Sequence, residues 1–332
     1  MLKVGLIGFG SISKGAHMSA YRRIKEENGP VVVEAICDLN PARLEGLEGY
    51  RLYTSVEEML EKEQGKLDYV DICVPTYLHA KLSIQAMEAG YNVLCEKPMA
   101  RNVEECQQMI DASKRTGKLL MTAFCNRFYG AAQYVRDLIK SGELGAVRNA
   151  EFSRIQDSAP TANPWFLDGE LSGGAALDLH IHDVDLINWM FGVPKSVNTV
   201  GKSSLTKGGY DSLSTNFLYE DNMFVHAYCD WTTLKCKYNV RTIAVYFEKG
   251  YVYVDRSAGR QVFVKVTNDG EVTDMSENLK FEAYYGEIMY YTDCLANGKP
   301  VSECLPENTI HSVRMVLAEI ESADKNGEVV TL

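Results

Sequence analysis

A lysine stands where an apolar segment of the chain ends. In LCEKPMA, residues 94–100, the run YNVLC leads directly into Glu96, Lys97 and Pro98. Burying an ammonium group is costly unless a partner or a reaction uses it. Proline fixes its own φ and keeps the preceding residue out of helical geometry. Lys97 is therefore a candidate catalytic residue held at the end of a buried strand; the alternative is a lysine whose head only reaches for water.

A carboxylate and an imidazole form a second candidate pair. Asp178 and His182 are four residues apart in a helix predicted over 173–191, so they share one face of it. A carboxylate beside an imidazole orients the ring and raises its proton affinity, which suits general acid/base catalysis near neutral pH. The alternative is a hydrogen-bonded structural histidine among solvent-facing acids. His180 points in a different direction from His182, so we expect no metal site here.

Two glycines and an acid indicate a nucleotide. Gly8 and Gly10 lie at the first turn from strand to helix, where glycine allows backbone N–H groups to approach a pyrophosphate. Ser13 replaces the third glycine of the usual fingerprint. The second apolar run ends at Asp38, which can accept both hydroxyls of an adenosine ribose and would repel a 2′-phosphate. We therefore predict NAD rather than NADP; the alternative for Asp38 is a turn or helix-capping role.

The elements that position these residues alternate between strand and helix. Apolar runs predict strands at 2–8, 31–37, 69–74, 91–95 and 118–124. Helices are predicted from the first strand to about residue 27, and over 55–63, 78–90 and 102–117, the last two of these three ending at glycine. Continuous apolar strands fit a sheet that is covered on both faces. We predict an α/β Rossmann domain with a doubly wound parallel sheet over residues 1–123.

The pattern changes after about residue 124. Helices are predicted over 131–142, 173–191, 282–296 and 306–324, with a strand near 147–155. Later strand-like runs turn near Gly250 and at Asn268–Gly270, the second a strong hairpin signal. The prediction for residues 124–332 is an α+β domain for substrate binding and oligomerisation. Its sheet is expected to be largely antiparallel and open on one face.

Composition limits the classes of partner. The 332 residues carry a net charge of −11, which disfavours nucleic acid and anionic membrane surfaces. No apolar run approaches the roughly 20 residues that cross a bilayer. Nine scattered cysteines without a CxxC pair, together with the lack of an export signal at the N-terminus, favour reduced thiols and a cytoplasmic location.

The order of the motifs along the chain is itself informative. A GxG turn, an acid ending the second strand, VPTYLH, EKP and GG…D-x-x-x-HD follow one another along the chain. The chain resembles the Gfo/Idh/MocA family of NAD(P)-dependent oxidoreductases over nearly its whole length. The segments VDICVPTYLHAKLSIQAMEAGYNVLCEKPMA and FCNRFYGAAQYVRDLIKSGELGAVRNAEF carry most of this resemblance. The family usually has TPN where this chain has Val74-Pro75-Thr76, a departure that leaves the backbone role of the turn intact.

The resemblance implies roles for particular residues. Lys97, Asp178 and His182 would converge on the substrate beside the nicotinamide. Residue types and spacing leave the identity of the base open between Lys97 and His182, which can titrate as a coupled unit. The predicted cofactor-binding residues are Gly8, Phe9, Gly10, Ser11, Ile12, Asp38, Val74, Pro75, Thr76, His79, Glu96 and Lys97. Asn126 and Trp165 join the three catalytic candidates as predicted substrate contacts, and for both the alternative is a structural role. For Glu96 the alternative to cofactor binding is a local pairing. For His79 the alternative is a role at the start of a helix.

The resulting prediction is hydride transfer between a nicotinamide and a secondary alcohol of a sugar, inositol or polyol. An NAD-dependent glycosidase that oxidises its substrate transiently is the first alternative, because the same residues would serve it. A dinucleotide-sensing regulator without catalysis is the second. We expect no metal, and we expect a homodimer or homotetramer formed through the open sheet face.

Overall fold

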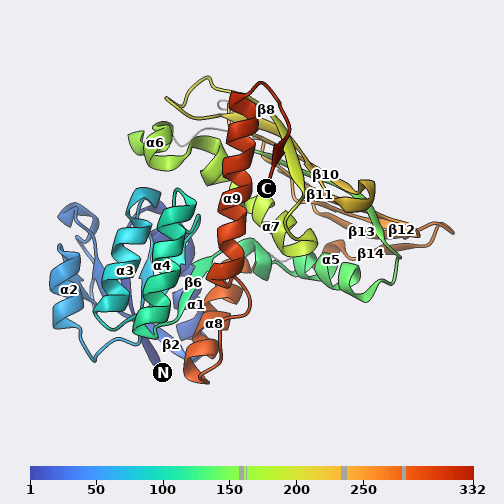
Figure 1. Cartoon of the computed structure of the whole chain (residues 1–332). Helices are drawn as coiled ribbons and strands as arrows, with labels where there is room; N and C mark the ends of the chain where they lie inside the picture. The colour runs from blue at the N-terminus through green and yellow to red at the C-terminus, as the bar shows by residue number, and fades with distance from the viewer. Residues whose placement is uncertain (157–160, 162, 233–237, 279–281) are drawn as a thin grey trace. The chain divides into compact units, whose positions relative to one another are not determined.

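The structure is a computed structural model that describes residues 1–156, 161, 163–232, 238–278 and 282–332. The chain divides into two compact units, which can be followed by colour in Figure 1. The first comprises Met1–Phe128 and Glu282–Ile310, and the second comprises Tyr129–Phe281 and His311–Leu332. The segment 282–310, which the sequence prediction placed with the second domain, therefore groups with the first unit.

The first unit is built on a six-stranded parallel sheet with the order β3-β2-β1-β4-β5-β6. This is the Rossmann arrangement predicted from the continuous apolar runs. The three-residue strand β3 was not located from sequence, because RLY is too short and too polar to stand out. The strands are β1 (Leu2–Ile7), β2 (Val31–Cys37), β3 (Arg51–Tyr53), β4 (Tyr69–Ile72), β5 (Asn92–Glu96) and β6 (Leu120–Ala123).

Helices connect these strands, and two of them begin after a residue whose side chain caps the first turn, at the predicted starts 55 and 102. The side chain of Ser55 accepts a hydrogen bond from the N–H of Glu58, and that of Asn102 accepts one from Glu105. Gly117 ends α4 in the left-handed conformation. The helical segments are η1, a π-helical turn (Ser13–His17), α1 (Met18–Glu26), η2 (Pro41–Arg43), α2 (Val56–Lys62), η3 (Thr76–Leu78), α3 (His79–Glu88), α4 (Val103–Thr116), η4 (Cys125–Phe128) and α8 (Ala283–Ala296).

The second unit contains a nine-stranded sheet with the order β14-β13-β12-β11-β7-β10-β9-β8-β15. Among the strands that the structure describes here, only β7 and β10 pair in parallel; the other neighbours are antiparallel, as predicted. The strands are β7 (Val147–Ile155), β8 (Ser196–Lys202), β9 (Ser212–Leu218), β10 (Phe224–Asp230), β11 (Val240–Phe247), β12 (Gly250–Asp255), β13 (Val262–Thr267), β14 (Val272–Asp274) and β15 (Val330–Thr331).

The predicted helix over 173–191 is confirmed from Gly174 onward, and it contains a π-helical turn that the sequence did not indicate. Gly173 and Gly174, both with positive φ, separate it from the short helix that precedes it, and the α-helix continues from Ile181. The helical segments of this unit are α5 (Gly130–Ser141), η5 (Pro164–Leu167), α6 (Gly169–Ser172), the π-helical turn η6 (Ala176–His180), α7 (Ile181–Phe191), η7 (Glu220–Asn222), η8 (Ser276–Asn278) and α9, which starts in the first unit (Pro306–Asp324).

The two faces of the second sheet differ. Along β9 and β10, alternate residues such as Leu213, Phe217 and Val225 are buried, and α7 packs against the sheet at β7 and β10. The residues between them remain partly exposed on the other face. No helix in the described part of the chain is long and apolar enough to cross a bilayer.

Candidate active site

The first strand of the Rossmann sheet ends in a tight turn. Gly8 has a φ of 92°, and a Cβ atom there would lie 2.4 Å from the carbonyl oxygen of Cys73, so only glycine fits. A Cβ atom on Gly10 would meet nothing within 4 Å, which leaves its backbone open to a ligand. Ser11 is exposed and Ile12 half-buried where η1 is about to begin. This turn fits a pyrophosphate approached by backbone N–H groups.

Asp38 follows the end of β2 and is tied to the same turn. Its Oδ2 accepts a hydrogen bond from the backbone N–H of Phe9 at 2.7 Å, and its Oδ1 accepts one from Asn40. Arg43 reaches Oδ2 at 3.2 Å. Sequence reasoning missed Arg43, although an arginine five residues after the acid was a visible signal. The acid beside an open glycine turn fits the adenosine ribose of a bound dinucleotide.

Lys97 directly follows β5, at the same edge of the sheet. The parallel strands β1, β2, β4 and β5 bring their carboxyl ends together, and the strand order changes direction between β1 and β4, where such sheets bind ligands. Lys97 is half-buried, and its bond to Pro98 is cis. Its backbone N–H donates to Oε2 of Glu96 at 2.9 Å. Burial favours the neutral form of Glu96, but its hydrogen bond to His17 prevails and lowers the pKa of that carboxyl.

His79 connects the turns that follow β4 and β5. Its Nδ1 lies 2.8 Å from the carbonyl oxygen of Pro98, and its Nε2 lies 2.9 Å from that of Val74. Burial lowers the pKa of His79, so the ring is neutral and donates to one of these two oxygens at a time. Pro75 is half-buried and Thr76 buried in the intervening turn. His79, the first residue of α3, therefore links the turn after β4 to the residue that follows Lys97.

Asp178 and His182 lie on consecutive segments of the second unit. Asp178 belongs to the π-helical turn η6, His182 belongs to the first turn of α7, and both are half-buried. The intervening His180 is buried, with Nε2 2.9 Å from Oε1 of Glu319 on α9. Burial opposes its charge, yet the Glu319 carboxylate raises the pKa of His180 well above its usual value. This buried pair holds the segment between the two candidate residues against α9.

The two predicted substrate contacts outside these groups lie in short helical turns. Asn126 is buried in η4 of the first unit. Trp165 lies in η5 of the second unit, with its ring stacked on Phe166 at a centroid distance of 3.9 Å. The first unit also contains a buried cluster that sequence reasoning did not find, centred on His17 and Asp71. The two carboxylates that contact His17 belong to Asp71 and Glu96, which are 54 and 79 residues away from it in sequence. No local sequence pattern indicates these contacts.

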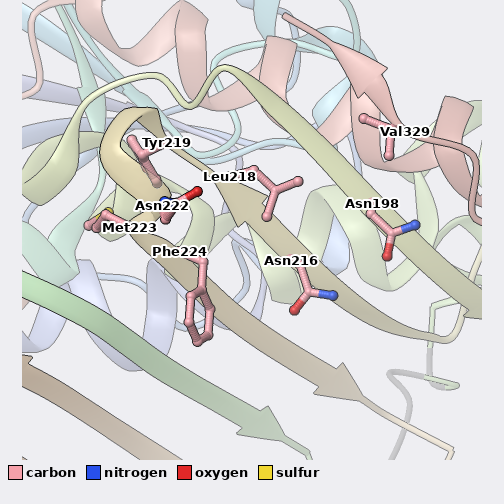
Figure 2. A pocket seen from close by; sticks show the side chains of 8 residues that line it. All are labelled: Asn198, Asn216, Leu218, Tyr219, Asn222, Met223, Phe224 and Val329. Atoms are coloured by element: carbon pink, nitrogen blue, oxygen red, sulfur yellow. The ribbon is translucent and has the colours of Figure 1, made fainter.

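One pocket is lined by none of these residues. It has a volume of about 420 Å³ and is formed at the strands β8, β9 and β10 of the second unit (Figure 2). None of its lining residues is among the predicted site residues, so its size alone does not connect it with the chemistry. The pocket is lined by Asn198, Asn216, Leu218, Tyr219, Asn222, Met223, Phe224 and Val329.

Two sequence profiles of one family match this chain. Residues 2–124 match the profile described as the oxidoreductase family with an NAD-binding Rossmann fold, and residues 132–253 match the Gfo/Idh/MocA C-terminal domain. The chain belongs to the Gfo/Idh/MocA family. The resemblance read from the GxG, EKP and D-x-x-x-HD motifs is confirmed.

Curated relatives of this family member include several dehydrogenases. The levoglucosan dehydrogenase of Pseudarthrobacter phenanthrenivorans is 33% identical over 64% of this chain and 58% of its own length. The D-glucoside 3-dehydrogenase of Escherichia coli is 30% identical over 59% of this chain and 56% of its own length. A 2,7-anhydro-N-acetylneuraminate hydratase of Mediterraneibacter gnavus is 27% identical over 70% and 61%. The aligned region thus spans about three fifths of the relatives it matches.

Solved structures agree in fold over the whole chain. A levoglucosan dehydrogenase in complex with NADH and levoglucosan has a TM-score of 0.85 at 23% identity and covers 99% of both chains. An oxidoreductase from Agrobacterium radiobacter in complex with NAD+, L-tartaric acid and magnesium has a TM-score of 0.84 at 20% identity, covering 99% of this chain and 98% of that one. At these identities the likeness establishes the shared two-domain fold.

Proposed function

We propose that this protein is an NAD-dependent dehydrogenase that oxidises a secondary alcohol of a sugar, inositol or polyol. The observation that carries the proposal is the edge of the Rossmann sheet, where the glycine turn, Asp38 and Lys97 come together. Family membership and the dehydrogenases among the relatives support it.

Three side chains divide the chemistry in this proposal. His182 accepts the proton of the substrate hydroxyl as the carbonyl forms, and Asp178 orients the imidazole. Lys97 donates a hydrogen bond to the reacting oxygen and stabilises its developing negative charge. When bound, NAD supplies the hydride acceptor. Asn126 and Trp165 are proposed to contact the substrate, and the remaining predicted cofactor residues at the sheet edge are proposed to hold the dinucleotide.

The preference for NAD over NADP is part of the proposal. In this proposal the Asp38 carboxylate, which follows the end of β2, faces the adenosine ribose, and its repulsion of a 2′-phosphate disfavours NADP. Arg43 pairs with this carboxylate and reduces the repulsion, so the preference is expected to be moderate rather than absolute.

An absorbance assay at the reduced-nicotinamide band tests the proposal. A panel of inositols, aldoses and alditols is offered with NAD and with NADP in parallel. We expect NAD-dependent turnover of at least one member. In the Lys97→Met variant we expect kcat to fall about 10²–10⁴-fold while the affinity for NADH is retained. Turnover of that variant near the wild-type rate would show that Lys97 does not have the proposed role.

A reaction without net oxidation is the second candidate. The hydratases among the relatives favour it, since adding water leaves no reduced cofactor behind. The same Lys97, Asp178 and His182 would serve a hydride that is removed and later returned. Release of an aryl alcohol from a glycoside, or consumption of an anhydro sugar, without accumulation of NADH would select this candidate over the dehydrogenase.

We further propose a homo-oligomer assembled through the open face of the second sheet and a cytoplasmic location. The open face carries aromatic side chains, including the neighbouring rings of Tyr246 and Tyr251 and the exposed Phe224. Exposed apolar surface of this kind usually meets a partner. The eight cysteines that the structure describes are buried free thiols, in keeping with a reducing compartment. Sedimentation analysis showing only monomers would contradict the oligomer.

A further inference from the structure

A buried histidine connects the cofactor turn with the catalytic strand end in the first unit. His17 ends the π-helical turn η1, which follows the Gly8–Gly10 turn. The ring is fully buried. Its Nδ1 lies 2.8 Å from Oδ2 of Asp71 on β4, and its Nε2 lies 2.9 Å from Oε1 of Glu96 on β5. One side chain thus joins three elements of the sheet edge.

The ring carries a proton on each nitrogen in this arrangement. Carboxylates only accept hydrogen bonds, so each of the two neighbours requires an N–H from the ring. Burial by itself lowers the proton affinity of an imidazole, but the charge of Asp71 outweighs it and the pKa of His17 is raised well above its usual value. His17 is therefore a buried cation between two carboxylates, with the ring of Tyr284 packed against it.

The contact with Glu96 leads directly to the proposed catalytic lysine. One oxygen of Glu96 faces His17, and the other accepts the backbone N–H of Lys97 at 2.9 Å. The carboxylate cannot turn toward the lysine head without losing the imidazole, because charge-assisted hydrogen bonds hold both of its oxygens. His79 holds the carbonyl of Pro98 on the other side of Lys97. The residues before and after the lysine are therefore fixed by separate histidines.

We propose that His17 is a positioning residue for Lys97: it holds the Glu96 carboxylate against the Lys97 backbone and so fixes the direction in which the lysine leaves β5. The inference rests on the catalytic role of Lys97 in the proposed function. π-helical turns occur often at functional sites, and here the turn ends at His17, whose ring contacts side chains on both β4 and β5.

A bound metal ion is the competing use of this cluster. His17, Asp71 and Cys73 offer ligand atoms that all lie within 4.8 Å of one another. Both ring nitrogens are already engaged by carboxylates, however, and burial raises the pKa of the Cys73 thiol, which keeps it protonated. The hydrogen-bond geometry therefore favours the cationic imidazole over a metal ligand.

The kinetic test compares His17→Gln, Glu96→Ala and the double variant. We expect each single change to lower kcat by up to about 10²-fold, the effect of a small misplacement of a catalytic group. For His17→Gln, which is not among the proposed cofactor-binding residues, NADH affinity is expected to stay within about threefold of wild type. Since His17 acts through Glu96, the double variant should be no slower than the slower single variant. The proposal would be overturned if the double variant lost kcat by the product of the two single losses. It would also be overturned if His17→Gln kept the wild-type kcat.

Two variants keep the test decisive if His17→Gln does not fold. Glu96→Gln retains an oxygen that can accept the Lys97 N–H, and it should be about tenfold faster than Glu96→Ala. Equal rates for these two would count against the proposal. Tyr21→Phe removes a hydroxyl that donates to Asp71, which contacts the other ring nitrogen of His17 rather than the one that faces Glu96. It is expected to lower the melting temperature but to leave kcat within about twofold.

A labelling experiment separates this inference from the proposed function. Trace acetylation followed by mass spectrometry measures the reactivity of Lys97 relative to the exposed Lys81, without any turnover. In His17→Gln and Glu96→Ala, we expect the reactivity of Lys97 to change in the same direction while Lys81 stays constant. If the wild type oxidises no alcohol but this pattern holds, the proposed function fails and the positioning role stands. Unchanged labelling, or one equivalent of zinc in the purified protein, would overturn the positioning role.

Discussion

Arg154 on β7 and Asp183 on α7 form a buried, bidentate ion pair. The Nε of Arg154 lies 2.9 Å from Oδ2 of Asp183, and Nη2 lies 2.5 Å from Oδ1. The two side chains are only 9% and 3% exposed. Asp183 directly follows His182, so this pair fixes the first turn of α7, which carries the proposed base, to a central strand of the sheet.

Replacing Asp183 with alanine is expected to destabilise the protein strongly. The change leaves the buried guanidinium of Arg154 without its countercharge, and such losses cost about 3–5 kcal/mol. Urea denaturation measures the difference. The exposed pair Lys195–Glu220, 3.6 Å apart, is the matched control. Glu220→Ala should change the free energy of unfolding by less than about 1 kcal/mol. Similar losses of unfolding free energy in Asp183→Ala and Glu220→Ala would contradict the argument that burial makes the Arg154–Asp183 pair important.

Gly8 and Gly10 are expected to respond differently to alanine. At Gly8 the positive φ and the close carbonyl of Cys73 should cost stability, about 1–3 kcal/mol. At Gly10 a methyl group meets no protein atom, so stability should stay within about 0.5 kcal/mol. The Gly10 variant should instead bind NADH at least about tenfold more weakly, as measured by fluorescence titration. Unchanged NADH binding in Gly10→Ala would place the pyrophosphate elsewhere.

Much of the fold was predictable because local signals coincide with packing. Apolar runs marked five of the six Rossmann strands, and Ser55, Asn102 and Gly117 mark helix ends in both sequence and structure. The π-helical turns η1 and η6 were not predictable. A π-helical turn contains one residue more than a turn of α-helix, and tertiary contacts accommodate this extra residue. The spacing of apolar residues in the surrounding sequence does not reveal the insertion.

The proposed site was predictable only where neighbouring residues in the sequence mark a reactive side chain. Lys97 stood out because an apolar strand and a proline enclose it. The surrounding contacts did not, because they join distant residues: His17 with Glu96, and His180 with Glu319. Histidines in such pairs resemble any other buried polar residue in sequence, and only the folded sheet edge brings their partners into reach.

Cofactor preference should depend on Asp38 and Arg43 together. Asp38→Asn removes the negative charge that opposes a 2′-phosphate and leaves Arg43 without its carboxylate partner. The ratio of kcat/KM for NAD to that for NADP should fall at least about tenfold. Adding Arg43→Ala to this variant should reduce NADP use again, since the guanidinium is then absent. An unchanged ratio in Asp38→Asn would show that the carboxylate does not face the ribose.

Glu287 on α8 makes the stability of the first unit depend on pH. It is fully buried, and no hydrogen-bond partner for either carboxyl oxygen occurs among the described residues. Burial raises the pKa of Glu287 well above its usual value of 4.5, outweighing the opposing charge of His17. The folded protein therefore retains a proton that the unfolded chain releases. Stability from this group is complete below about pH 4.5 and is lost as pH rises toward the folded-state pKa, by up to about 1.4 kcal/mol per unit.

Glu287→Gln tests this pH dependence, because glutamine imitates the neutral carboxylic acid without titrating. Near pH 4 the variant and the wild type should be equally stable. At pH 7 the variant should be the more stable of the two, since it no longer has to retain a proton on folding, and the difference should grow between pH 4 and pH 7. Urea denaturation at several pH values measures this difference, and groups such as His17 and Glu96 titrate in both proteins and largely cancel. A difference that does not change with pH would show that Glu287 is ionised in the folded protein.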